Sequence, residues 1–350
     1  ITAGFKEIGR SGAELEKEFM SVCERYDMRV LGPNVVGFID THTPINATFL
    51  KGYPPKGEIA FISQSGAILA SILDWSISAG IGYSKIYSLG NKADLSEVDF
   101  IAEAVDDPNT KVILCYIEDV THGSEFLKVV AEATRKKPVV ILKSGTSQSG
   151  ALAASSHTGA LAGDCNIWEG IVRQTGAVPV AGFEAWFDYL MGFTMLTEQL
   201  GDRIAIISGP GGLAVSAAEA CAENKLRLAS LSPETRKALA EVVPPTGTSL
   251  RNPIDVGLTA SLDIGIYINS IKMVVADPAV DAVVIIGAGL TPEANRLYTD
   301  AIVETRRQSG KAILMVNIPG FDPSYIPLFC NAGIPYFESS ERALKTYAGI

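Results

Sequence analysis

Histidine is scarce in this sequence, with three residues in 350, and no two cysteines have the CxxC spacing of a zinc or redox site. The five cysteines are scattered and odd in number, which is typical of reduced thiols in the cytosol. No apolar run reaches the length of a membrane span, and the first residues lack a signal-peptide pattern. We therefore expect a cytoplasmic protein with no membrane partner.

Positively charged residues are also few, because the sequence has 29 Lys and Arg but 39 Asp and Glu, which gives a net charge of -10. This balance disfavours a polyanionic partner, and we expect no nucleic-acid binding. The GxxxxGK[ST] motif is missing, which excludes a P-loop as the phosphate site. Metal-ligand spacing of Cys, His, Asp or Glu is missing too, so we expect no metal site.

An internal repeat is the most informative feature that is present. At 57–67 and again at 202–214, a buried apolar strand leads into a Ser/Gly turn and a helix of small residues. Further segments match in the same order: 107–114 with 277–284, 137–142 with 310–316, and 175–179 with 331–335. This alternation predicts an α/β fold of tandem doubly wound parallel sheets, which are two flavodoxin-like domains.

The repeat also sets the domain limits. We place the two flavodoxin-like domains at residues 56–199 and 200–350, with a separate N-terminal part at 1–50. The first residue, Ile1, is not Met and falls directly into a segment that looks like the end of a strand. We therefore expect the chain to be a fragment of a larger assembly.

The N-terminal part shows weaker patterns. We expect an amphipathic helix over 11–26, with Ser11 and Glu14 as its capping box, and a short strand over 29–32. From there to Pro55, turn formers without periodicity indicate a connector.

Two strand-to-helix turns are candidate anion sites, because helix N-termini present unpaired N–H groups at the carboxyl ends of the strands. The first comprises Ser65, Gly66 and Ala67, and the second comprises Gly209, Gly211 and Gly212. We expect the two helix ends to bind one phosphate group without Lys or Arg. The alternative is that these glycines only permit tight packing of strand against helix.

A long loop rich in Gly and Ser, residues 143–164, follows the apolar strand 139–142 and holds His157. Loops of this length are usually functional or disordered. An imidazole among small residues suits covalent or acid–base chemistry. The alternative is a solvated surface histidine in a linker.

These residues resemble the α part of the nucleoside-diphosphate-forming acyl-CoA synthetases, the superfamily that includes succinyl-CoA synthetase and ADP-forming acetyl-CoA synthetase. The most specific likeness is to the phosphohistidine loop of that family, at Ser155-Ser156-His157-Thr158-Gly159-Ala160-Leu161-Ala162-Gly163. Five shorter segments support it: Leu31-Gly32-Pro33-Asn34, Ser63-Gln64-Ser65-Gly66, Ser88-Leu89-Gly90-Asn91, Tyr116-Ile117-Glu118 and Asn252-Pro253-Ile254-Asp255-Val256-Gly257. Together the similar segments cover nearly all of the chain.

The resemblance implies an ADP-forming acid–thiol ligase of the acetate–CoA ligase kind. In such an enzyme the phosphoryl group of an acyl phosphate passes to His157 and then to ADP. Glu118 matches the family's carboxylate that orients the histidine. Such an acceptor is needed because one ring nitrogen attacks phosphorus only when the other nitrogen is held by a hydrogen-bond acceptor. Asp119 is a competing acceptor, and a solvated loop acid is the plain alternative for Glu118.

The resemblance also implies binding partners. Coenzyme A is expected near Thr2, Ala3, Gly4 and Asn34, which match the closing part of a Rossmann-like CoA-binding domain. No ATP-grasp domain is visible, so ATP or ADP with Mg²⁺ would bind to another subunit or domain, in a hetero- or homo-oligomer. The acid is a small carboxylic acid, with acetate, branched and aromatic acids left open. A second hypothesis is an inactive acyl-CoA-binding scaffold of a protein acetyltransferase or regulator, against which the presence of His157 and Glu118 argues.

Overall fold

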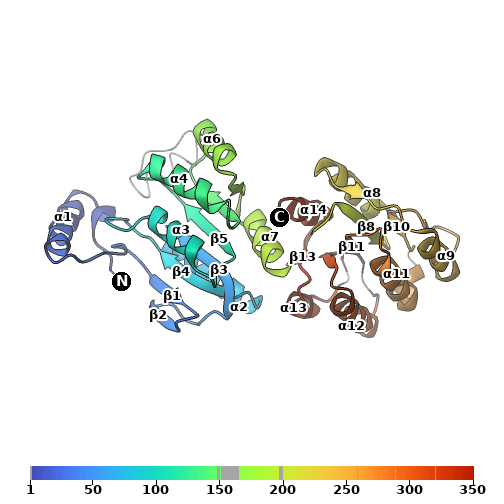
Figure 1. The fold of residues 1–350 in the computed structure, drawn as a ribbon. Coiled ribbons are helices and arrows are strands. Elements are labelled where there is room, and N and C mark those ends of the chain that lie inside the picture. Colours follow the sequence, from blue (N-terminus) through green and yellow to red (C-terminus); the bar gives the residue numbers. More distant parts are fainter. Residues whose placement is uncertain are drawn as a thin grey trace. The chain divides into compact units, whose positions relative to one another are not determined.

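The computed structural model describes residues 2–147, 150, 165–196, 200–257, 259–287, 289–319 and 321–350. The chain forms two compact units, Ile1–Trp186 and Phe187–Ile350, and each is built around one sheet (Figure 1). The division falls within helix α7 (Phe183–Met195).

The first unit contains a seven-stranded sheet in the order β2-β1-β4-β3-β5-β6-β7. Its strands are β1 (Gly37–Asp40), β2 (Ile45–Thr48), β3 (Lys56–Ser63), β4 (Tyr83–Ser88), β5 (Val112–Ile117), β6 (Val139–Lys143) and β7 (Val178–Pro179). Strands β3 to β7 are parallel, whereas β1 runs antiparallel to both β2 and β4. Strand β5 is apolar and buried along its whole length, as expected for a parallel strand covered on both faces.

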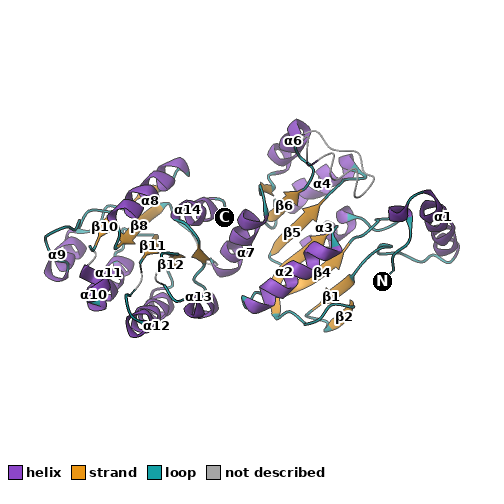
Figure 2. Cartoon of the chain, turned by 180° about the vertical axis from the view of Figure 1, so that it is seen from behind, coloured by secondary structure: helices purple, strands orange, loops and turns teal. Residues whose placement is uncertain are grey.

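Helices cover both faces of this sheet. Helix α2 lies in front of the sheet in Figure 2, whereas α3 and α4 lie on the opposite face. The helical segments of the unit, besides the start of α7, are η1 (Lys6–Ile8), α1 (Arg10–Arg25), α2 (Gly66–Ser78), α3 (Glu97–Asp106), α4 (Gly123–Ala133) and α6 (Cys165–Thr175).

The second unit contains a six-stranded sheet in the order β10-β8-β11-β12-β13, with β9 also paired to β8. Its strands are β8 (Arg203–Ser208), β9 (Arg227–Leu228), β10 (Ile254–Asp255), β11 (Ala282–Ile286), β12 (Ala312–Val316) and β13 (Tyr336–Phe337). Its helical segments are α8 (Gly211–Glu223), α9 (Pro233–Val242), α10 (Thr259–Leu262), α11 (Ile264–Ala276), α12 (Pro292–Ser309), η2 (Pro323–Tyr325), α13 (Ile326–Asn331) and α14 (Ser340–Ala348). Every pairing between these strands is parallel.

Asn252 joins two short strands that lie beside β8. Strand β9 pairs with the start of β8 and β10 pairs with its end. Between them, the Asn252 side chain accepts a hydrogen bond from the N–H of Ile206 at 2.9 Å. It also donates to the carbonyl oxygens of Ile204 at 2.7 Å and Ala229 at 3.0 Å. One side chain thus supplies the ladder bonds that an uninterrupted strand would make.

The repeat in the sequence is a repeat of topology. The order β4-β3-β5-β6-β7 in the first sheet matches β10-β8-β11-β12-β13 in the second, and both follow the 2-1-3-4-5 order of flavodoxin-like folds. Equivalent contacts recur as well, because Lys137 donates to the carbonyl oxygen of Asp107 and Lys311 donates to that of Asp277. The predicted pair of flavodoxin-like domains is therefore confirmed.

The N-terminal part differs from the prediction. The expected connector before Pro55 contains strands β1 and β2, and the expected strand over 29–32 is irregular. Helix α1 matches the predicted helix within one residue at each end, but Gly9, not Ser11, precedes its first turn and no side chain caps it. The Rossmann-like identity of residues 1–50 and the three domain limits remain predictions.

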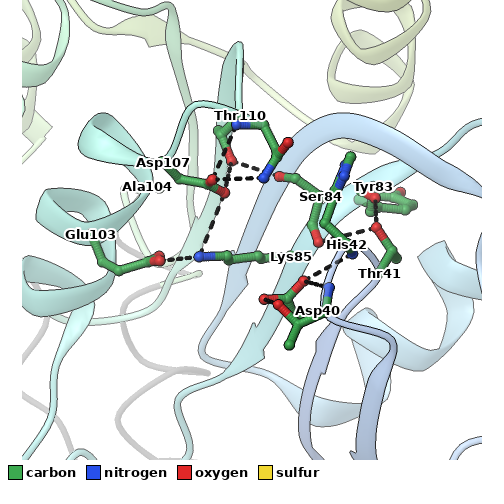
Figure 3. Close-up of polar contacts among 12 residues, drawn as sticks. Asp40, Thr41, His42, Tyr83, Ser84, Lys85, Glu103, Ala104, Asp107 and Thr110 are labelled. Atoms are coloured by element: carbon green, nitrogen blue, oxygen red, sulfur yellow. Dashed lines mark hydrogen bonds and ion pairs between the residues drawn. The ribbon is translucent and has the colours of Figure 1, made fainter.

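A group of polar contacts surrounds β4 at the end of the sheet away from the strand-to-helix turns and links it to the residue after β1 and to α3 (Figure 3). Thr41 donates to the carbonyl oxygen of Tyr83 at 2.6 Å. On β4, Lys85 forms ion pairs with Glu103 of α3 and, at 3.5 Å, with Asp107. The Thr41 bond and the ladder with β4 hold the antiparallel strand β1, which the sequence did not reveal.

Candidate active site

A cavity of about 1080 Å³ in the first unit contains members of each predicted group of site residues. It lies at the carboxyl ends of β3 and β5, where a doubly wound sheet binds its ligands. The predicted residues that line it are Thr2, Ala3, Asn34, Ser65, Gly66, Ala67 and Glu118. Contacts within one unit therefore bring together residues that are far apart in the sequence.

The turn between β3 and α2 forms one wall of the cavity. Ser65 is the N-cap of α2, and its side chain accepts a hydrogen bond from the N–H of Ile68 at 3.4 Å. The N–H groups of Gly66 and Ala67 belong to the first helical turn and have no acceptor within the helix. A Cβ atom on Gly66 would lie 2.5 Å from Cγ2 of Val36, so the close approach requires glycine here. The packing role and the anion-binding role of this glycine are therefore compatible.

The equivalent turn in the second unit has the same hydrogen bonds. Ser63 Oγ donates to the carbonyl oxygen of Ser65, and Ser208 Oγ donates to that of Pro210, both at 2.8 Å. The N–H of Gly209 donates to the carbonyl oxygen of Ile286 at 3.2 Å. In the first unit, the N–H of Gln64 donates in the same way to the carbonyl oxygen of Tyr116 at 3.0 Å. Gly209, Gly211 and Gly212 thus stand where Gln64, Gly66 and Ala67 stand in the first unit. The two turns differ in the neighbour of the first helical glycine. A Cβ atom on Gly211 would overlap Oδ2 of Asp255, a carboxylate, whereas Gly66 lies against Val36.

The turn formed by Glu118 and Asp119 is held at every backbone polar group. Gln64 Oε1 accepts hydrogen bonds from the N–H of Glu118 at 2.9 Å and of Asp119 at 3.1 Å. Lys143 donates to the carbonyl oxygen of Glu118 at 2.7 Å, and Lys92 donates to that of Asp119 at 2.9 Å. Three side chains therefore fix this turn: Gln64 after β3, Lys92 after β4 and Lys143 at the end of β6. The turn bears Glu118, which lines the cavity.

The Asp119 carboxylate has partners of its own. Its Oδ1 lies 3.1 Å from Nζ of Lys92 and accepts a hydrogen bond from Gln64 Nε2. Burial raises the pKa of Asp119, but the Lys92 ammonium and the Gln64 hydrogen bond outweigh burial and hold that pKa below its usual value. Both Glu118 and Asp119 line the cavity, and the Asp119 carboxylate is held in this network by Lys92 and Gln64.

Two further groups beside Glu118 have shifted pKa values. Burial lowers the pKa of Lys143, and the carboxylates of Asp119 and Glu118 only partly offset this effect. Burial also raises the pKa of Tyr116, and the charge on Glu118 adds to that rise. The surroundings of Glu118 therefore combine the half-buried ammonium of Lys143 with the neutral phenol of Tyr116.

The predicted CoA residues divide into two sets. Thr2, Ala3 and Asn34 line the cavity, and Asn34 Nδ2 donates to Asn91 Oδ1 at 3.3 Å. Gly4 instead uses its N–H to donate to Glu7 Oε1 at 2.6 Å. Sequence reasoning missed four polar cavity residues: Lys6, Glu7, Gln64 and Asn91. Gln64 and Asn91 lie inside quoted motifs, which was the available signal, whereas Lys6 and Glu7 carry none.

His157 lies outside the described residues. The described start of its segment leaves the sheet beside Glu118, because the N–H of Ser144 donates to the carbonyl oxygen of Ile117 at 2.9 Å. In the ranges that the structure describes, no group of three or more His, Cys, Asp or Glu could hold a metal ion. No helix among those residues is long and apolar enough to cross a membrane.

Family models agree with this architecture. Residues 56–193 match the succinyl-CoA ligase like flavodoxin domain, and residues 204–310 match the Ligase-CoA domain. A solved structure of acetyl-coenzyme A synthetase 1 from Ca. Korarchaeum cryptofilum, in complex with phosphate and ADP, superposes with a TM-score of 0.86. The two chains are 32% identical, and the match covers 100% of this chain and 75% of that one.

Curated relatives point to the same group of proteins. The α subunit of acetate–CoA ligase [ADP-forming] I from Pyrococcus furiosus is 33% identical over 100% of this chain and 76% of its own length. The 4-hydroxybutyrate–CoA ligase [ADP-forming] of Nitrosopumilus maritimus is 38% identical over 100% of this chain, which spans 50% of that relative. This chain belongs to the family of ADP-forming acyl-CoA ligases and corresponds to its α part.

Proposed function

We propose that this chain is the part of an ADP-forming acyl-CoA synthetase that binds CoA and carries the phosphorylated histidine. The reaction is acid + CoA + ATP = acyl-CoA + ADP + phosphate, through an acyl phosphate and a phosphohistidine at His157. The cavity of the first unit carries the proposal, since the α2 N-terminus, the fixed turn at Glu118 and Thr2, Ala3 and Asn34 all line it.

The chain's own residues account for the phosphoryl transfer. In the ATP-forming direction, a neutral imidazole nitrogen of His157 attacks phosphorus, the bond to the acyl oxygen breaks, and the carboxylate leaves. Glu118 accepts the proton on the other ring nitrogen in a hydrogen bond and stabilises the positive charge that develops there. The N–H groups of Gly66 and Ala67 stabilise the phosphoryl oxygens. Gly209, Gly211 and Gly212 offer an equivalent anion-binding turn in the second unit.

The proposed reaction also needs a nucleotide, a carboxylic acid and CoA. Nucleotide and Mg²⁺ bind to an ATP-grasp subunit or domain that completes the enzyme, in the cytoplasm. The acid is a small carboxylic acid, which relatives named for acetate and 4-hydroxybutyrate support. CoA reaches the cavity past Thr2, Ala3 and Asn34.

Intact-mass measurement tests this proposal. The complete enzyme, incubated with ATP and Mg²⁺, should gain the mass of one phosphoryl group, and acid should remove it because phosphohistidine is acid-labile. His157→Ala should show no gain. A wild-type enzyme that makes acyl-CoA but gains no phosphoryl group would refute the phosphohistidine, and an enzyme with neither property would support an inactive scaffold.

A further inference from the structure

Lys92, four residues after the end of β4, is a buried cation. Its side chain is 2% exposed, and Nζ lies 3.0 Å from Oε2 of Glu97 and 3.1 Å from Oδ1 of Asp119. The Glu97 side chain is 0% exposed. Among the described residues, neither oxygen of Glu97 has a hydrogen-bond partner, so the ion pair with Lys92 is what balances its charge.

A pair of this kind is not explained by stability alone. Removing two charges from water is costly, and apolar side chains of similar volume often serve folding equally well. The backbone of Lys92 also has a φ of +55°, in the left-handed region that non-glycine residues seldom adopt. Lys92 therefore combines a buried charge with an unfavourable backbone conformation, and its ammonium contacts Asp119, the residue beside Glu118.

We propose that Lys92, anchored by Glu97, is a positioning residue for Glu118. Its ammonium holds both the carbonyl oxygen and the carboxylate of Asp119. That carboxylate in turn binds Gln64, which holds the N–H of Glu118. The inference deepens the proposed function and rests on it, because it assigns the residue that fixes the turn bearing Glu118, whose carboxylate is expected to orient His157.

The first turn of α3 makes the anchor rigid. Glu97 is the first residue of α3, where a negative charge is stabilised by the helix dipole. Ser96 and Asp99 form a capping box at the same turn, with the Ser96 N–H donating to Asp99 Oδ2 at 2.9 Å. The capped start of α3 thus fixes Glu97, Glu97 fixes Lys92, and Lys92 fixes the turn at Asp119.

The test replaces both members of the Lys92–Glu97 pair, so that neither is left as a buried ion without its partner. Asp119 loses the Lys92 ammonium but is 29% exposed and keeps its hydrogen bond from Gln64. In the complete enzyme, the double variant Lys92→Met/Glu97→Met should remain folded, as circular dichroism checks, and should have an unchanged KM for CoA. The rate of phosphoenzyme formation should fall about 10²-fold, as expected when a catalytic group is displaced by about 1 Å. The same pair of changes made in a Glu118→Gln enzyme should cause no further loss, because the group to be positioned is already impaired.

Lys85→Met is the matched control. Lys85 lies near the start of β4 and pairs with Glu103 and Asp107, away from the cavity. It should alter stability and leave the phosphorylation rate unchanged. An unchanged rate in the double variant, or an equal loss with and without Glu118, would overturn the inference while wild-type labelling left the proposed function intact. Absence of labelling in the wild type would overturn both.

Discussion

Gln64 Oε1 accepts a hydrogen bond from the backbone N–H of Glu118 at 2.9 Å, so the turn that begins α2 and the expected catalytic acid are joined directly. Gln64 also accepts from the N–H of Asp119 and donates to its carboxylate. The Ser63-Gln64-Ser65 segment therefore supports both the proposed anion-binding turn and the backbone of Glu118 in one cavity.

Gln64→Met should remove this link. The variant leaves two backbone N–H groups without their acceptor, at about 1–3 kcal/mol for each such buried group, and releases Glu118. We expect lower stability in urea unfolding and slower phosphoenzyme formation. Gln308→Met is the matched control, because Gln308 and Glu304 form an exposed pair on α12. Equal results for the two variants would contradict the link.

Gly212 tests whether backbone N–H groups bind the anion in the second unit. Among the described residues, none lies within 4 Å of a Cβ atom added at this glycine. Gly212→Ala keeps the N–H and should keep phosphate binding, measured by calorimetry with inorganic phosphate. Gly212→Pro removes the N–H in a first helical turn, where proline is tolerated, and should weaken binding. Equal affinities in the two variants would remove this turn from the site.

Asn252→Ala should destabilise the second unit. The change removes three hydrogen bonds that the Asn252 side chain makes, two to β8 and one to Ala229, the residue after β9. At about 1 kcal/mol for each bond, the loss should reach about 3 kcal/mol. Unfolding followed by hydrogen exchange should show faster exchange at β8 and no change at β3. Asn224→Ala, which removes one bond at the end of α8, should cost less.

Acid should destabilise the first unit partly through Asp107. Burial raises the pKa of this carboxyl, but the N–H of Asn109, the Thr110 hydroxyl and Lys85 outweigh burial and lower the pKa below its ordinary value of 3.8. A lowered pKa contributes stability above the ordinary value, and that stability is lost as pH falls through the lowered one. Urea midpoints should therefore drop below about pH 4, and Asp107→Asn should flatten this dependence. An unchanged slope in the variant would contradict the assignment.

The sequence predicted much of the fold because its parallel strands are buried runs such as 112–117 and 282–286, which repeat in order. Strands β1 and β2 escaped because they are four residues long and lie among turn formers, too short for an alternating pattern. The cavity was predictable at Glu118 and Gly66, since strand ends and helix starts meet there. Lys92 was not, because a sequence does not distinguish a buried lysine from a solvated one.

Rapid-quench phosphorylation of the complete enzyme, comparing wild type, His157→Ala and Glu118→Gln, tests the central claim most directly. His157→Ala should form no phosphoenzyme from ATP or from acyl phosphate, because the nucleophile is gone. Glu118→Gln should form it about 10²–10⁴-fold more slowly, as expected when a positioned acid–base group loses its charge. A parental rate in Glu118→Gln, or acyl-CoA synthesis by His157→Ala with ATP consumption, would contradict the account.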